Sequence, residues 1–257
     1  MLTASQRLFF DLNGYVLIRN AFTRAECTEL VAIAHAMQAS GQGRDPADRQ
    51  HILHCPIRHS RKVLEVAMAP RLREPAEAIV GGEARLEECE FLVFFPDREI
   101  AAEAVSREHK FRWHRGLTPD YGSFEHNGNY HCLLAKVIVY LTPQGQRTGT
   151  WLVPGSHRHG VRIADFERLA QPEQEFATHV DAQQGDVLLF GETLIHSSPL
   201  RPYDEERILL VIAYSPPFMR PWSAQSDPPP ELDYDISPEE RRFIYGEARY
   251  DFRGEHL

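Results

Sequence analysis

The chain has 257 residues, 42% of them hydrophobic and 25% charged, which is typical of a globular domain that buries a substantial core. Its formal net charge of −9 argues against nucleic acid polymers and anionic membranes as partners, because no overall basic field would attract them. No apolar run approaches the roughly 20 residues that span a bilayer, and the first residues lack a signal-peptide pattern, so we expect a cytoplasmic protein.

The first third of the sequence is predicted to be largely helical. Residues 4–12 are expected to form a helix, and residues 23–37 carry apolar positions at helical spacing. The apolar run 15–20 between them is typical of a short strand. We expect this N-terminal helical part to cover about residues 1–83.

From about residue 84 the pattern changes to short apolar runs separated by glycine and proline signals. Such a series indicates a sandwich or barrel and not alternating β-α units. The expected fold class is mainly β with flanking helices, built on a jelly-roll core over about 84–218. The tail, 219–257, contains a helix signal that Ser237 would cap, and we expect it to wrap around the core of a single domain covering 1–257. The apolar runs are 85–96, 110–114, 131–143, 148–157, 185–190, 193–198 and 207–216.

Two of the 13 histidines stand out by their positions in these strands. His114 ends an aromatic and basic run, and His196 follows a Gly-Asp turn and its apolar strand. Either one alone is more commonly a structural histidine, but Arg207 follows in the next strand and makes the set more specific. A non-haem Fe(II) oxygenase binds its metal on one face with two imidazoles and a carboxylate, which leaves positions for the cosubstrate and dioxygen. The pair is therefore a candidate iron site.

Arg207 suits the cosubstrate 2-oxoglutarate, which chelates such a metal at one end and needs a fixed cation for its far carboxylate. The arginine follows His196 by eleven residues, enough for a turn and a return along the neighbouring strand. Its fork can pair with a carboxylate through two hydrogen bonds. Ser198 lies on the same strand face as His196 and is a candidate hydrogen-bond donor to that carboxylate.

These motifs resemble those of the phytanoyl-CoA dioxygenase-like branch of the Fe(II)/2-oxoglutarate oxygenases. The resemblance covers about residues 5–218 and implies a double-stranded β-helix, cupin-like core. It also implies His114 and His196 as iron ligands and Arg207 as the anchor for 2-oxoglutarate. The stretches that carry it are NGYVLIRNAFTRAECTEL, FRWHRG, PGSH at 154–157, GDVLLF at 185–190 and the His-Ser-Ser of 196–198.

One position departs from this family, because Gly116 stands where the H-x-D motif has its acid. A non-catalytic relative is one interpretation, and replacement by another acid, such as Asp120 or Glu125, is a second. The third follows the Fe(II)/2-oxoglutarate halogenases, which resemble these hydroxylases but have glycine or alanine at this position. Chloride carries the same charge as a carboxylate, and glycine leaves room for it. Since the other site residues are intact, we expect a halogenase with Fe(II), 2-oxoglutarate and chloride as cofactors and dioxygen as cosubstrate.

The expected reaction is chlorination of an unactivated C–H bond of a free small molecule. Several cations near the site favour an anionic substrate, such as a nucleoside or nucleotide. Lys136 leads one face of its predicted strand, and if that face points inward, the lysine needs an anion as partner. A free amino acid is the alternative substrate, and a hydroxylase or a non-catalytic binding relative is the alternative function. Candidate contacts with substrate or cosubstrate are Lys136, Arg115 and Tyr121.

Overall fold

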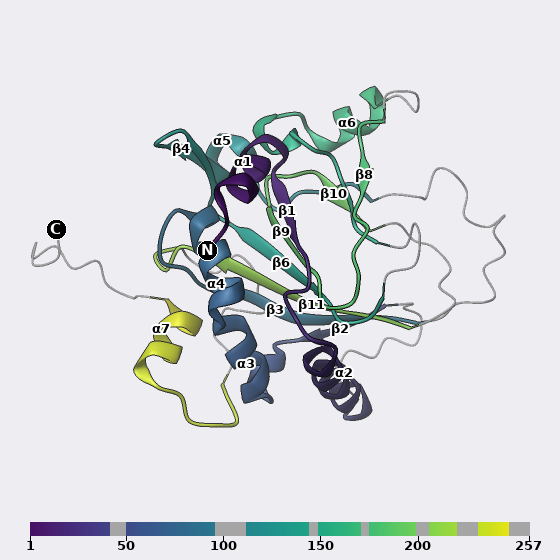
Figure 1. Ribbon diagram of the computed structural model, residues 1–257, viewed down its shortest axis with the longest axis vertical. Helices are drawn as coiled ribbons and strands as arrows, with labels where there is room; N and C mark the ends of the chain where they lie inside the picture. The colour runs from purple at the N-terminus through teal and green to yellow at the C-terminus, as the bar shows by residue number, and fades with distance from the viewer. Residues whose placement is uncertain are drawn as a thin grey trace, which may run out of the picture.

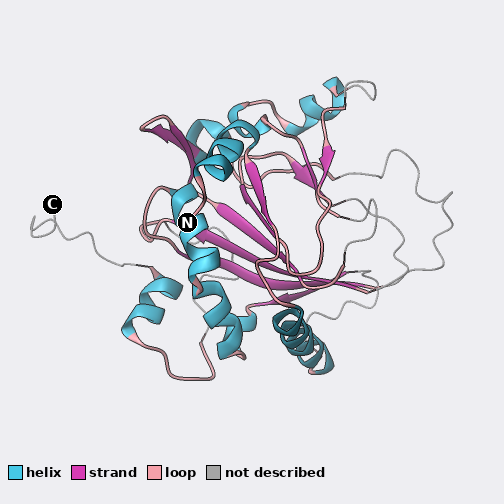
Figure 2. Ribbon diagram, in the orientation of Figure 1, coloured by secondary structure: helices cyan, strands magenta, loops and turns pink. Residues whose placement is uncertain are grey.

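The computed structural model describes residues 1–41, 50–95, 112–143, 149–170, 175–198, 206–219 and 231–246. Within them the chain forms mostly antiparallel sheet with flanking helices, which confirms the predicted fold class (Figures 1 and 2). Of the strand predicted over 110–114, residues 110 and 111 lie outside this part of the chain. No helix in the described residues is long and apolar enough to span a membrane.

A six-stranded sheet runs through the centre of the molecule (Figure 1). Its two edge strands, β1 and β2, come from the first 83 residues, so that part of the chain is not only helical. The short β2 escaped prediction because its place in the sheet depends on pairing with β3 and not on an apolar pattern of its own. Across the sheet the order is β1 (Tyr15–Ile18), β9 (Val187–Gly191), β6 (Ala135–Tyr140), β11 (Arg207–Ser215), β3 (Arg85–Phe94) and β2 (Gln50–His54).

A smaller sheet lies over one face of the large one. It has the order β10 (His196–Ser197), β7 (Trp151–Leu152) and β8 (Thr178–His179). A separate hairpin joins β4 (Ser123–His126) to β5 (Asn129–Cys132) through Asn127 and Gly128. Both turn residues have positive φ, 51° and 77°, the backbone conformation for which an Asn-Gly pair is favoured in tight hairpins.

Helices pack against the opposite face of the large sheet, where α3 and α4 lie alongside its strands (Figure 2). The tail helix begins as predicted, because the Ser237 side chain accepts the Glu240 N–H and the Glu240 carboxylate accepts the Ser237 N–H. The helices are α1 (Ala4–Asn13), α2 (Arg24–Ala39), α3 (Arg61–Met68), α4 (Pro70–Val80), α5 (Pro119–Gly122), α6 (Ile163–Leu169) and α7 (Pro238–Tyr245), with 3-10 turns η1 (Pro56–Arg58) and η3 (Ser156–Arg158).

Alternation along β11 divides the core into two layers. Ile208 and Leu210 pack with the helices, whereas Leu209 and Val211 pack toward the smaller sheet. We call this second side the inner face of the six-stranded sheet. Arg207 has the same parity as Leu209 and therefore belongs to the inner face, where the candidate site also lies.

Candidate functional site

His114 and His196 face each other across a single antiparallel bridge. Each backbone N–H donates to the other residue's carbonyl, at 3.0 Å from His114 and 2.9 Å from His196. Directly opposed residues of an antiparallel pair project their side chains to one face, and here the imidazole centroids are 4.1 Å apart. His196 is buried and His114 is exposed, so the pair lies where the inner face meets the surface. The structure brings the two predicted iron ligands together.

Both imidazoles are oriented by backbone carbonyls. Nδ1 of His114 lies 2.9 Å from the carbonyl oxygen of Arg112, and Nδ1 of His196 lies 2.9 Å from that of Leu194. A carbonyl only accepts, so each Nδ1 carries the proton and each Nε2 keeps its lone pair, as in histidines that bind metals. Burial lowers the pKa of His196 to about 4, which keeps the ring neutral and able to coordinate at neutral pH. On the imidazole side, the residues fit a divalent metal.

Gly116 lies directly against the carboxylate of Glu192. A Cβ at position 116 would be 2.6 Å from Glu192 Oε2, which is closer than side-chain carbons come to other atoms. The Gly116 N–H donates to this oxygen and to the backbone carbonyl of Glu192, both at 2.9 Å, and Leu117 N–H donates to the same carbonyl at 3.1 Å. The space that glycine leaves is therefore occupied by a carboxylate from another part of the chain.

Glu192 also belongs to a buried ion cluster with Lys136 and Glu88. The Lys136 Nζ lies 2.9 Å from Glu88 Oε2 and 3.0 Å from Glu192 Oε1. The second contact is an ion pair whose angles fall short of a directed hydrogen bond. Lys136 was predicted to meet an anion if its strand face points inward; the face does point inward, and the anions it meets are two side chains of the protein.

The charges in this cluster stabilise one another. Burial alone raises the pKa of Glu192, but the cation of Lys136 and the nearby His196 and His114 outweigh it, and the pKa falls to about 2. Burial likewise disfavours the Lys136 ammonium, yet the two carboxylates keep its pKa above the ordinary value. Glu192 is thus an anion at neutral pH.

Within the described residues, no three His, Cys, Asp or Glu side chains surround a point that would hold a metal ion. The imidazole pair is in place, but the Glu192 carboxylate, as it lies, is bonded to Lys136 and to the Gly116 N–H. The two alternative acids considered from the sequence point elsewhere. Glu125 forms an ion pair with Arg158, and Asp120 lies near Gly160, where a Cβ would be 3.5 Å from its Oδ1.

Arg207 is 3% exposed, and its guanidinium lies 4.2 Å from the centroid of the Phe94 ring, its register partner on β3. This places a buried cation on the inner face, where the 2-oxoglutarate anchor was predicted. Ser198 follows β10 and is exposed. The buried hydroxyl next to it, that of Ser197, accepts the Arg112 N–H at 2.9 Å and so helps to position the strand that carries His114.

Arg115 and Tyr121 are the remaining predicted contacts with substrate or cosubstrate. Arg115 donates to the backbone carbonyls of Val161 at 2.6 Å and His159 at 2.8 Å, so its guanidinium fixes the loop that follows η3. Tyr121 is 69% exposed on the surface. Arg115 therefore has a structural role in the described molecule, and contacts of Arg115 or Tyr121 with a substrate stay predictions.

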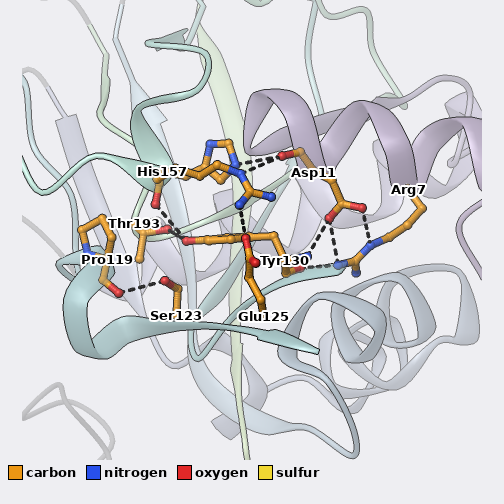
Figure 3. A network of polar contacts seen from close by, with 9 residues as sticks. Arg7, Asp11, Pro119, Ser123, Glu125, Tyr130, His157 and Thr193 are labelled. Atoms are coloured by element: carbon orange, nitrogen blue, oxygen red, sulfur yellow. Dashed lines mark hydrogen bonds and ion pairs between the residues drawn. The ribbon is translucent and has the colours of Figure 1, made fainter. Parts of the chain in front are cut away.

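Thr193, the residue after Glu192, belongs to a polar network with Tyr130 and His157 (Figure 3). The Tyr130 hydroxyl lies 2.7 Å from Thr193 Oγ1 and 2.9 Å from the His157 carbonyl oxygen. The His157 ring is buried, and its Nε2 lies 3.2 Å from the Asp11 carbonyl oxygen in α1. Burial lowers the pKa of His157 to about 4, so this histidine of the PGSH motif is a neutral structural group. It ties the first helix to the site.

Glu90, on the inner face of the sheet, makes the free energy of unfolding depend on pH. It is buried beside Glu88, and burial followed by that neighbouring charge raises its pKa to about 7. A carboxyl whose folded pKa is raised above 4.5 stabilises the fold fully below pH 4.5 and loses this contribution as the pH rises through 7. We expect Glu90→Gln to raise the free energy of unfolding at pH 8, by at most about 3 kcal/mol, and to change it little at pH 4.5.

Urea unfolding at the two pH values measures this effect. The Nδ1 of His54 lies 3.2 Å from Glu90 Oε2, but the His54 side chain is 43% exposed. Burial of Glu90 is therefore the main cause of its raised pKa. An equal gain at both pH values would contradict the assignment.

Comparisons with known proteins identify one family and several solved structures with the same fold. Residues 10–200 match the family described as Phytanoyl-CoA dioxygenase (PhyH). No curated protein sequence matches the chain. Solved structures with the same fold include HygX from Streptomyces hygroscopicus with nickel, 2-oxoglutarate and hygromycin B bound, at 21% identity over 94% of this chain and 100% of that one, with a TM-score of 0.70.

Two enzymes of nogalamycin biosynthesis share the fold as well. The carbocyclase SnoK is 16% identical over 92% of this chain and 94% of its own, with a TM-score of 0.68. The epimerase SnoN, in complex with Fe3+, alpha ketoglutarate and nogalamycin RO, is 18% identical over 82% of each chain, with a TM-score of 0.61. At such identities the likeness shows a common fold.

Glu192 is the residue that sequence reasoning missed. It stands in the run GDVLLFGETLIHSS, four positions before His196 and otherwise among apolar and small residues. A buried acid in such a run needs a partner, and this signal was available. Its spatial partner, Gly116, is 76 positions away, and only the fold brings the two together.

Proposed function

The chain belongs to the phytanoyl-CoA dioxygenase family, and on that basis we propose that it is an Fe(II)/2-oxoglutarate-dependent enzyme that oxidises a C–H bond of a free small molecule. The observation that carries the proposal is the pair His114 and His196, with both Nδ1 atoms bonded to carbonyls and both Nε2 lone pairs available. Iron with 2-oxoglutarate and dioxygen supplies the oxidising equivalents for such a reaction when bound.

The protein's residues take the following parts in this proposal. His114 and His196 bind the metal, and the exposed side of His114 leaves an approach for the substrate. Arg207, buried against Phe94, binds the far carboxylate of 2-oxoglutarate in surroundings where a charge pair is little weakened by water. Ser198 is the proposed hydrogen-bond donor to the same carboxylate.

Halogenation is the second candidate, and the absence of a carboxylate at Gly116 favours it. In that case chloride binds next to the iron in the space beside Gly116, and chlorine instead of hydroxyl is transferred to the substrate carbon. The proximity of Glu192 Oε2 to this space weighs against a second anion there. Oxygen transfer is therefore the outcome that the geometry supports better.

The substrate is proposed to be a free small molecule without a required phosphate. The cations that suggested a nucleotide are engaged by the protein itself: Lys136 by Glu88 and Glu192, and Arg115 by backbone carbonyls. The fold neighbours HygX and SnoN have hygromycin B and nogalamycin RO bound, respectively. A mass-spectrometric screen should therefore include neutral and amine-bearing sugars and polyketides beside nucleotides and amino acids.

The first experiment is an anaerobic titration of the protein with Fe(II) and 2-oxoglutarate. The proposal expects a metal-to-ligand absorption band that requires all three components. Chloride added afterwards separates the two candidates, since a halide ligand would shift the band and an oxygenase site would not respond. Absence of the band in the wild-type protein would overturn the iron function altogether.

Replacing Arg207 with alanine should raise the 2-oxoglutarate concentration needed for half-maximal band intensity by at least about tenfold, because a charge-assisted hydrogen bond contributes about 1.5–3 kcal/mol. Arg207→Lys keeps the charge but loses the paired donors of the guanidinium, so the 2-oxoglutarate concentration that it needs should lie between those of the wild type and the alanine variant. Metal affinity without 2-oxoglutarate serves as the control and should not change. Unaltered 2-oxoglutarate dependence in the alanine variant would place the anchor elsewhere.

A further inference from the structure

Glu192 lies where the acid of the H-x-D motif is missing, and what we infer for it rests on the proposed iron function. Three facts converge on Glu192. Its Oε2 lies 2.6 Å from where the Cβ of a residue at 116 would be, and its Cδ lies 3.2 Å from that point. The Gly116 N–H donates to the same oxygen at 2.9 Å. The carboxylate therefore stands at the root of the side chain that the family's motif would place at position 116.

Glu192 is tied to both histidine segments through the backbone. Its carbonyl accepts the N–H groups of Gly116 and Leu117, two and three residues after His114. On its own segment it precedes His196 by four residues, in the turn that Thr193 and Tyr130 hold. These bonds hold the backbone of Glu192 beside both histidine segments.

The two carboxylate oxygens of Glu192 have different surroundings. Oε1 lies 3.0 Å from the Lys136 ammonium, whereas Oε2 accepts only a single backbone N–H among the bonds described. A carboxylate that ligates a metal is commonly held by a partner on its second oxygen. Lys136, fixed in turn by Glu88 at 2.9 Å, is such a partner.

We propose that Glu192 supplies the carboxylate ligand that position 116 lacks, so that His114, His196 and Glu192 form the facial metal site. Glu192 accepts the Gly116 N–H and forms an ion pair with Lys136. Metal binding therefore requires its side chain to rotate Oε2 away from the Gly116 N–H while Oε1 stays paired with Lys136. Glycine at 116 is then needed for space, and the glutamate occupies the position that a halide would take in a halogenase.

Metal binding by the full chain tests the proposal without reference to turnover. The chelator-treated protein is titrated with Co(II) and, anaerobically, with Fe(II), by calorimetry. Glu192→Gln should lower the affinity by at least about tenfold, the smallest loss usual for groups that support a metal ligand. Glu90→Gln is the control, because it also removes a buried carboxylate from β3, but one that contacts His54 on β2; its metal affinity should equal that of the wild type.

Glu192→Asp and Glu192→Gly extend the test. The aspartate keeps the charge on a shorter arm and should bind metal better than the glutamine variant. The glycine variant vacates the space, so its Fe(II)/2-oxoglutarate band should become chloride-sensitive, whereas the wild-type band should not respond to chloride. Circular dichroism and thermal unfolding establish that each variant is folded.

The outcomes separate this inference from the function on which it rests. Equal metal affinities of the wild type and Glu192→Gln, or a wild-type band that shifts with chloride, would overturn the role of Glu192 and leave the iron function standing. A wild-type protein that binds neither Co(II) nor Fe(II) would overturn both.

Discussion

Replacing Lys136 with methionine is expected to lower the free energy of unfolding by about 3–5 kcal/mol at pH 7, the usual loss when one partner of a buried ion pair is removed. Lys136 contacts Glu88 and Glu192, whose side chains are 15% and 3% exposed. Without the cation, a buried and a partly buried carboxylate lose their counter-charge, and their mutual repulsion and desolvation destabilise the fold.

The pH dependence of this loss follows from the pKa of Glu192. In the wild type it lies at about 2, below the ordinary 4.5, so its contribution is fully present above pH 4.5 and is lost as the pH falls toward 2. In Lys136→Met the buried acid has a raised pKa and takes up its proton at higher pH. The difference in stability between the two proteins should therefore shrink as the pH falls from 7 toward 4.

Urea unfolding at pH 7 and pH 4 measures both effects. Lys62→Met is the matched control, because Lys62 Nζ lies 3.0 Å from Glu29 Oε2 with both side chains exposed, so only a small part of the loss should recur there. The triple variant Lys136→Met/Glu88→Gln/Glu192→Gln removes all three charges and should recover much of the stability. If Lys62→Met and Lys136→Met cost the same, the cluster does not act as a buried ion network.

Gly116→Asp is the second large effect, and the two interpretations of the site predict opposite results. If the space beside Gly116 serves a halide, the aspartate restores the family's motif and metal affinity should equal or exceed that of the wild type. If Glu192 is the ligand, a side chain 2.6 Å from its Oε2 must displace it, and two carboxylates compete for one position. We expect the second result, with an affinity loss of about tenfold or more.

The double variant Gly116→Asp/Glu192→Ala decides the matter. Removal of the Glu192 carboxylate leaves the new Cβ 3.3 Å from the Cβ of residue 192, a close approach that a small shift relieves. The exchanged carboxylate should then recover metal binding to within about tenfold of the wild type. Gly82→Asp, where a Cβ meets nothing within 4 Å, controls for an added charge. An undiminished affinity in the single variant would refute the ligand role of Glu192.

The fold class could be predicted from the sequence, and so could the pair of histidines as a candidate site. Short, continuous apolar runs between turn signals, such as 207–216, indicate strands of a buried sheet, and this depends only on local order along the chain. His114 and His196 could be selected because each stands in a predicted strand and because the motifs around them resemble those of a known family. Ser237 was likewise predictable, since a capping box is complete within four consecutive residues.

The surroundings of those histidines depend on how the strands are arranged in the fold. Glu192 and Gly116 are 76 residues apart, and Lys136 and Glu88 are brought together by strands on either side of β11. Such contacts depend on the order of the strands in the sheet, which the apolar runs along the sequence do not encode. From the sequence, Gly116 only lacked the carboxylate of the family's motif, and Lys136 was a cation that needed an anion. In the folded chain, the Glu192 carboxylate contacts both residues.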